Sequence, residues 1–215
     1  MVAKVRRVAF HGVEVIEVET KVTIASGLPA FTVVGLPDKA VAESRERVRA
    51  ALASLGLGLP PKRITVNLAP ADVLKEGSHF DLPIALGLLA AMDVLPLDEI
   101  GHYLAVGELA LDGSLTPVGG VLLAALAASG RELGIICPVE SGGEAAWAGE
   151  VEVVAAPTLL SIVNHFKGTQ LLPPPEAKLA PPPSAGLDFR DVALVNELIL
   201  SFCGAEPARV IRIDP

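Results

Sequence analysis

The chain has 215 residues, of which 51% are hydrophobic and only 4% aromatic, and its formal net charge is −8 at pH 7. This length allows one generous domain, or one domain with a tail, built on an aliphatic core. The negative charge argues against bulk nucleic-acid binding. No apolar run reaches the roughly 18 residues that a membrane helix needs, and the first residues lack a signal-peptide segment. We therefore expect a soluble, cytoplasmic protein with no membrane partner.

The charge is distributed unevenly along the chain. Residues 1–63 hold ten Lys and Arg against six Asp and Glu, a net of +4, whereas the remainder holds seven against nineteen, a net of −12. Such asymmetry marks an interaction surface or, alternatively, a solvated basic helix. The two cysteines and four histidines are scattered without the spacing of metal ligands, so we predict no metal site.

Strand and helix patterns alternate over the first 170 residues. Residues 13–25 sort their side chains with a period of two, which is typical of a strand with one buried face. Together with strands at 4–10 and 31–35, this pattern predicts an antiparallel meander. The later strands are expected at 64–68, 103–109, 134–138 and 151–155, and the helices at 39–55, 84–92, 121–128, 140–147 and 158–166. The alternation after residue 64 predicts an α/β fold with helices packed on the sheet, and Asp112-Gly113 predicts a hairpin turn.

A loop followed by an apolar helix lies at the centre of the chain, over residues 75–92. Asp81 is a candidate N-cap and Pro83 fits the first helical turn. The residues that follow leave no polar side chain on any face of the helix, and such a helix is expected to be buried. We expect a surface loop attached to a core helix.

The helix at 39–55, with Asp38 as its candidate N-cap, carries basic residues opposite its apolar stripe. Glu43 and Arg47 have the favourable order for an ion pair one turn apart. The candidate nucleic-acid contacts are Arg45, Arg47, Arg49, Lys62 and Arg63. They could bind phosphates with release of counterions, or they could only keep the helix soluble. No aromatic residue lies among them, so base stacking is not predicted.

The composition changes after residue 170. Triple prolines at 173–175 and 181–183 predict an extended linker over residues 171–186. Residues 187–215 are too few for another independent core. We therefore expect one domain over residues 1–170, followed by the linker and by a divergent tail or the remnant of a further module.

Several long motifs occur in order, at residues 26–38 (SGLPAFTVVGLPD), 42–49, 62–72, 75–83 and 106–109. Together they resemble the N-terminal domain of the ComM/YifB family, magnesium-chelatase-related, ChlI-like AAA+ proteins. The resemblance covers about residues 1–170 and implies a ribosomal-protein-S5-domain-2-like fold, related to the proteolytic domain of Lon. The residues that match the family's loop motif are Lys75, Glu76, Gly77, Asp81 and Pro83.

The resemblance also implies what the full-length family does. It implies an AAA+ module in the same chain, ATP and Mg as cofactors, and a hexameric DNA helicase that drives branch migration. ATP hydrolysis needs a Gly-x-x-x-x-Gly-Lys-Ser/Thr loop, and none occurs in these 215 residues. We therefore predict no cofactor-binding residue here.

Lon proteases carry a catalytic serine in this loop and a lysine on the helix after a Gly-Gly pair. The matching positions here are His79 and Ala124, and Ser78 stands where Lon has proline. A serine nucleophile needs a base to activate it, so we predict no catalytic residue. The chain is expected to be a non-catalytic domain that supports oligomerisation and DNA engagement. The alternatives are a diverged Lon-like serine hydrolase using Ser78 and His79, and a magnesium-chelatase-type subunit.

Overall fold

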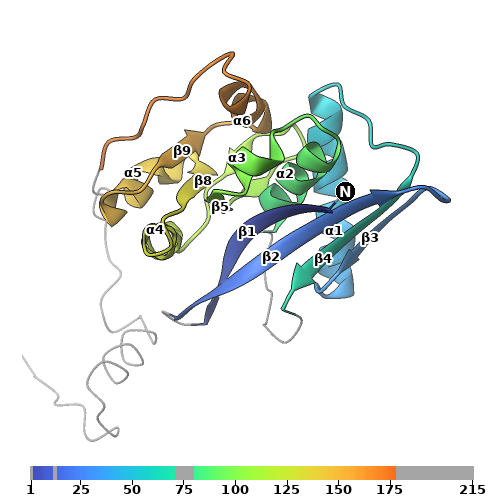
Figure 1. The fold of residues 1–215 in the computed structure, drawn as a ribbon, viewed down its shortest axis with the longest axis horizontal. Helices are drawn as coiled ribbons and strands as arrows, with labels where there is room; N and C mark the ends of the chain where they lie inside the picture. Colours follow the sequence, from blue (N-terminus) through green and yellow to red (C-terminus); the bar gives the residue numbers. More distant parts are fainter. Residues whose placement is uncertain (1, 12–13, 71–79, 178–215) are drawn as a thin grey trace, which may run out of the picture. The chain divides into compact units, whose positions relative to one another are not determined.

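The computed structural model describes residues 2–11, 14–70 and 80–177, which belong to the compact unit Met1–Leu179 (Figure 1). Seven strands form one mixed sheet in the order β3-β4-β2-β1-β5-β8-β9. Its strands are β1 (Val2–His11), β2 (Glu14–Ala25), β3 (Ala30–Val34), β4 (Arg63–Ala69), β5 (Tyr103–Ala105), β8 (Gly134–Pro138) and β9 (Val153–Ala156). The α/β fold class expected from the sequence is confirmed.

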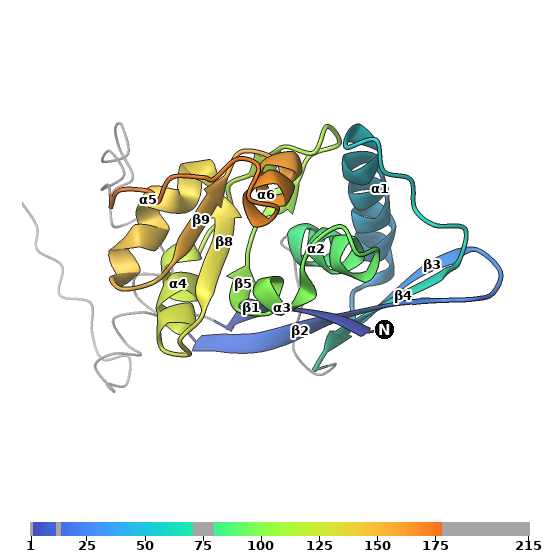
Figure 2. The same ribbon diagram turned by 45° about the horizontal axis from the view of Figure 1, so that its top comes forward.

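The helices pack on both faces of this sheet. They are α1 (Asp38–Ser54), α2 (Asp81–Ala91), α3 (Leu97–Ile100), α4 (Val121–Ser129), α5 (Gly142–Ala145) and α6 (Leu159–Phe166). The helix α2 lies over β1 and β2, whereas α4 covers the opposite face at β5 and β8 (Figures 1 and 2). The core therefore has two parts, one on each face of the sheet.

The predicted antiparallel meander of the first three strands is wrong in one pairing. The strands β1 and β2 are antiparallel, as expected, but β4 lies between β2 and β3. The strands β3 and β4 are parallel because α1 connects them as a crossover helix, and such a connection returns the chain in the same direction. The central helix α2 is confirmed as buried over residues 81–90.

Two predicted elements are interrupted. The strand expected over residues 103–109 splits at Gly107, whose φ of 157° lies in the region that favours glycine. The segment after it forms a separate hairpin of β6 (Glu108–Leu109) and β7 (Leu115–Thr116), which confirms the predicted turn at Asp112. The helix expected at 140–147 is only the short α5, flanked by the 3₁₀ turns Val139–Ser141 and Ala146–Ala148.

The residues after α6 remain in contact with the domain. The Leu172 N–H donates to His165 Nδ1 at 3.0 Å, and a Cβ built on Gly142 would lie 3.1 Å from Pro175. The segment 171–177 passes α5 and β9 in both views (Figures 1 and 2). The strand β9 is the last of the sheet, yet all four of its residues are buried. Proline-rich chain beside an edge strand protects it from unwanted pairing.

Among the described residues, none of the helices has the length and apolar character needed to cross a bilayer.

The close contact between α2 and β2 depends on Gly87, because a Cβ at this position would lie 2.7 Å from Val22 Cγ2. We expect Gly87→Ala to destabilise the fold by about 1–3 kcal/mol, since the extra methyl overpacks the core. Gly58→Ala is the matched control, because a Cβ there meets nothing within 4 Å. Urea unfolding measures both, and equal midpoints for the two variants would contradict this account of the packing.

Candidate functional site

A carboxylate is buried at the N-terminus of α2. Asp81 is the first residue of the helix and its side chain is 0% exposed. The N-cap residue is Phe80, with no side-chain hydrogen bond at the cap, so the prediction of Asp81 as N-cap is wrong. The helix starts inside the core, and the carboxylate is directed to a cation instead of the free backbone N–H groups.

That cation is Arg47 of α1. Its Nε lies 2.5 Å from Asp81 Oδ2 and its Nη2 lies 3.3 Å from Oδ1, so the ion pair is bidentate. Burial raises the pKa of Asp81, and the hydrogen bond from Arg47 acts in the opposite direction. The same hydrogen bond raises the pKa of Arg47, whose side chain is 21% exposed. The contact therefore stabilises the charged form of both side chains. Asp81 has no access to water, whereas Arg47 is partly exposed.

A second arginine, Arg7, is buried next to this pair. It lies on β1, is 2% exposed, and holds its Cζ 3.5 Å from the centre of the Phe80 ring. Its Nε donates to the Val8 carbonyl at 2.7 Å, and its Nη1 has no hydrogen-bond partner among the described residues. Burial lowers the pKa of Arg7 to about 9, against the effect of Asp81, so the guanidinium stays protonated at neutral pH.

Sequence reasoning missed Arg7, although the sequence contains a signal for it. Side chains alternate between the faces of a strand, and Ala3, Val5 and Ala9 share their parity with Arg7. All three are buried against the α2 side of the sheet. An arginine in such an inward series is a candidate for a buried charge.

A basic groove of about 520 Å³ lies between α1 and the residues that lead into β4. Arg45 and Arg49 are one helical turn apart on α1 and line one side of it. The other lining residues are Pro29, Ala30, Phe31, Gly58, Leu59, Pro60, Pro61, Lys62 and Ile64. The Arg45 Cζ lies 5.9 Å from the Phe31 ring centre, and its Nε has no partner among the residues described.

The groove brings together three of the five predicted nucleic-acid contacts: Arg45, Arg49 and Lys62. Arg47 lies on the other side of α1, engaged with Asp81. Arg63 precedes the buried Ile64 on β4, so its exposed side chain lies on the opposite face of the sheet.

The family loop motif is only partly within the described residues. Lys75, Glu76 and Gly77, together with Ser78 and His79, fall in the range 71–79, outside the described residues. Pro83 lies in the first turn of α2, as predicted, and is buried. Ala124, at the position where Lon carries lysine, is a residue of α4 and is 0% exposed, packed in the core on one face of the sheet.

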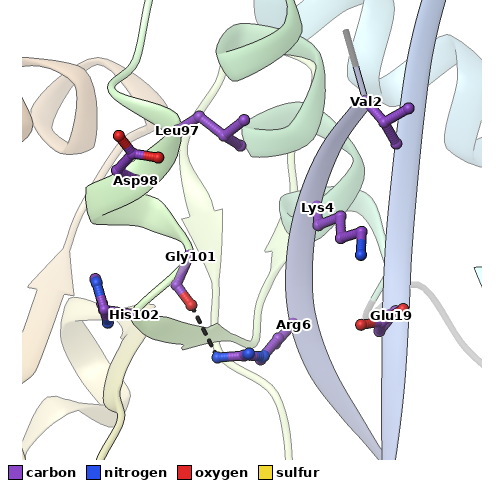
Figure 3. A pocket seen from close by; sticks show the side chains of 8 residues that line it. All are labelled: Val2, Lys4, Arg6, Glu19, Leu97, Asp98, Gly101 and His102. Carbon is purple, nitrogen blue, oxygen red and sulfur yellow. Dashed lines mark hydrogen bonds between the residues drawn. The ribbon is translucent and has the colours of Figure 1, made fainter.

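A further pocket of about 340 Å³ opens where β1 and β5 diverge, since these strands pair only at Arg6 and Leu104. Arg6 Nη1 donates to the Gly101 carbonyl at 3.0 Å across it (Figure 3). Its charged and titratable lining residues are Lys4, Arg6, Glu19, Asp98 and His102. Both cations and carboxylates line this pocket, so it presents no single charge to a ligand.

Comparison with known proteins identifies the class to which this domain belongs. Residues 18–141 match the family described as subunit ChlI of Mg-chelatase, and the chain belongs to that family. It is 44% identical over 165 residues to competence protein ComM of Haemophilus influenzae, a match that covers 77% of this chain and 32% of that protein. It is 40% identical over 181 residues to YifB of Salmonella typhimurium, covering 84% of this chain and 36% of that protein.

The YifB protein of Escherichia coli is 48% identical over 124 residues, covering 57% of this chain and 24% of that protein. These similarities confirm the ComM/YifB resemblance drawn from the sequence motifs. The first two of these relatives are about three times as long as the part that this chain matches, since the match spans about a third of each.

The asymmetric burial of the Asp81–Arg47 pair predicts unequal effects of removing its two members. Arg47→Met leaves a buried carboxylate without a counterion and should destabilise the fold by about 3–5 kcal/mol. Asp81→Asn should cost less, because Arg47 retains access to water. Arg49→Met is the control, because its 3.8 Å pair with Glu46 is exposed and worth less than about 1 kcal/mol. Chemical denaturation measures all three, and equal losses for Arg47→Met and Arg49→Met would contradict the prediction.

Proposed function

We propose that this chain is a non-catalytic N-terminal domain of a ComM-like AAA+ protein, one that supports homo-oligomerisation and engages DNA. In this proposal the AAA+ module binds ATP and Mg, and the complete protein acts as a DNA helicase in branch migration. The membership in the ChlI family and the similarity to competence protein ComM support this assignment.

The observation that carries the DNA role is the basic groove. Arg45, Arg49 and Lys62 come from two separate segments and line one concave surface. Cations gathered in this way neutralise successive phosphates of a strand and release its counterions. The protein as a whole is acidic, so a local basic groove directs DNA to one place on its surface.

The non-catalytic part of the proposal is supported by the position of Ala124. The Lon resemblance requires a lysine there to activate a serine, and the alanine is fully buried among apolar residues of α4 and β8. A hydrolase that used Ser78 would need another base.

Substitution of the groove arginines tests the DNA role directly. We expect Arg45→Ala with Arg49→Ala to weaken binding of a labelled DNA oligonucleotide, single-stranded or duplex. The slope of log affinity against log salt should fall by about 0.7–0.9 for each lost phosphate contact. Fluorescence anisotropy over a salt series measures both quantities.

The matched control is Lys21→Ala with Arg63→Ala. It removes the same formal charge from residues on the face of the sheet opposite α1. This control should retain the wild-type affinity and slope. If both double variants lose affinity equally, the binding is non-specific attraction to net charge, and the groove is not the DNA contact.

A further inference from the structure

The basic groove between α1 and the chain that leads into β4 is lined mostly by apolar residues. Only Arg45, Arg49 and Lys62 among its lining residues are charged, and the others are apolar side chains or glycine. A phosphate backbone pairs with the three cations but gains nothing from an apolar surface. The lining therefore suits a ligand that carries both phosphates and an apolar face.

Arg45 connects the cations of the groove to its apolar surface. Phe31 on β3 is only 7% exposed, and Arg45 Cζ lies over its ring at 5.9 Å from the ring centre, within the range of a cation–π contact. The sequence has no aromatic residue among the predicted contacts, and the fold supplies this one from another element. A planar guanidinium that packs on an aromatic ring and borders a groove offers a surface on which a nucleobase stacks.

The wall of the groove opposite α1 is held by its own main chain. Pro60 and Pro61 have fixed backbone φ angles. The Lys62 N–H donates to the Pro60 carbonyl at 2.7 Å, and the Lys62 carbonyl accepts from the Ala30 N–H at 3.3 Å. A wall preorganised in this way loses little conformational entropy when a ligand binds. The volume of the groove, about 520 Å³, is in the range of sites that enclose small organic groups.

We propose that the groove is a base-binding subsite for single-stranded DNA, in which one nucleobase stacks on Arg45 while Arg49 and Lys62 bind the flanking phosphates. In a duplex the bases are paired and stacked on one another, so a duplex offers the groove only its backbone. A single strand presents the faces of its bases, and stacking on them requires no particular sequence. The inference rests on the DNA role in the proposed function and adds to it that the bound DNA is single-stranded.

An abasic strand separates base binding from phosphate binding, because it keeps every phosphate and has no bases. We expect the full chain to bind oligothymidine at least about fivefold more tightly than an abasic strand of equal length, the effect of one stacked base. The slope of log affinity against log salt should be the same for both strands, because the phosphate contacts are the same. Fluorescence anisotropy of the labelled strands over a salt series measures both quantities.

Conservative substitutions identify the residue that holds the base. Arg45→Lys keeps the positive charge but removes the planar guanidinium. It should lower the affinity for oligothymidine to near that for the abasic strand, and leave binding of the abasic strand and of a duplex hairpin unchanged. Arg49→Lys is the matched control one helical turn away, and it should retain the preference for oligothymidine. Circular dichroism checks that both variants are folded.

The outcomes separate this inference from the proposed function. If oligothymidine and the abasic strand bind equally, and both lose affinity in the variant with Arg45→Ala and Arg49→Ala, the groove binds phosphates alone. The base subsite is then wrong and the DNA role stands. If neither strand binds, or if that double variant binds both strands as wild type does, the DNA role fails and the subsite fails with it. Equal loss of the preference in Arg45→Lys and Arg49→Lys would overturn the assignment of the base to Arg45.

Discussion

The removal of α2 from water determines where the other elements lie. Residues 82–90 of this helix are apolar or glycine on every face, so no orientation could leave one side in solvent at low free-energy cost. The strands β1 and β2 pack against one side of α2, and α1 packs against it as well. Gly87 permits the close approach to Val22 that closes the layer. The sheet order and the crossover through α1 both serve this one burial.

A helix that begins inside the core creates an electrostatic problem at its first residue. Asp81 has no route to water, so its charge must be balanced within the protein. Arg47 supplies that balance from the middle of α1, and the contact fixes the rotation of α1 about its axis. Because Arg45 and Arg49 lie on a different side of the same helix, this rotation directs them to the groove. The buried ion pair thereby connects the packing of the core to the surface proposed for DNA.

The sequence was informative where a local pattern has one physical meaning. The uniformly apolar α2, the two-residue period of β2 and the Asp112 hairpin were all predicted, because burial, alternation and turn chemistry are encoded within a few residues. The place of β4 between β2 and β3 was not predicted, since alternation identifies the faces of a strand but not its neighbours.

The candidate site shows the same limit. The structure places Arg45, Arg49 and Lys62, three of the predicted contacts, along one groove. Arg47, also predicted as a surface contact, instead pairs with Asp81, which was predicted as a cap. An aspartate at a helix start suits a cap and a buried ion pair equally well by residue type. Only the contact between α1 and α2, which are distant in sequence, distinguishes the two.

The protected edge at β9 has a consequence for growth of larger aggregates. A fibre made by adding strand to strand needs two open edges on every subunit, because each new copy must offer a fresh edge to the next. Here the chain following α6 lies beside one edge, and prolines cannot complete a ladder of hydrogen bonds. Strand addition therefore cannot continue at the β9 edge. The segment 171–177, which the sequence predicts to be part of a linker, thus lies where it keeps other strands from this edge of the sheet.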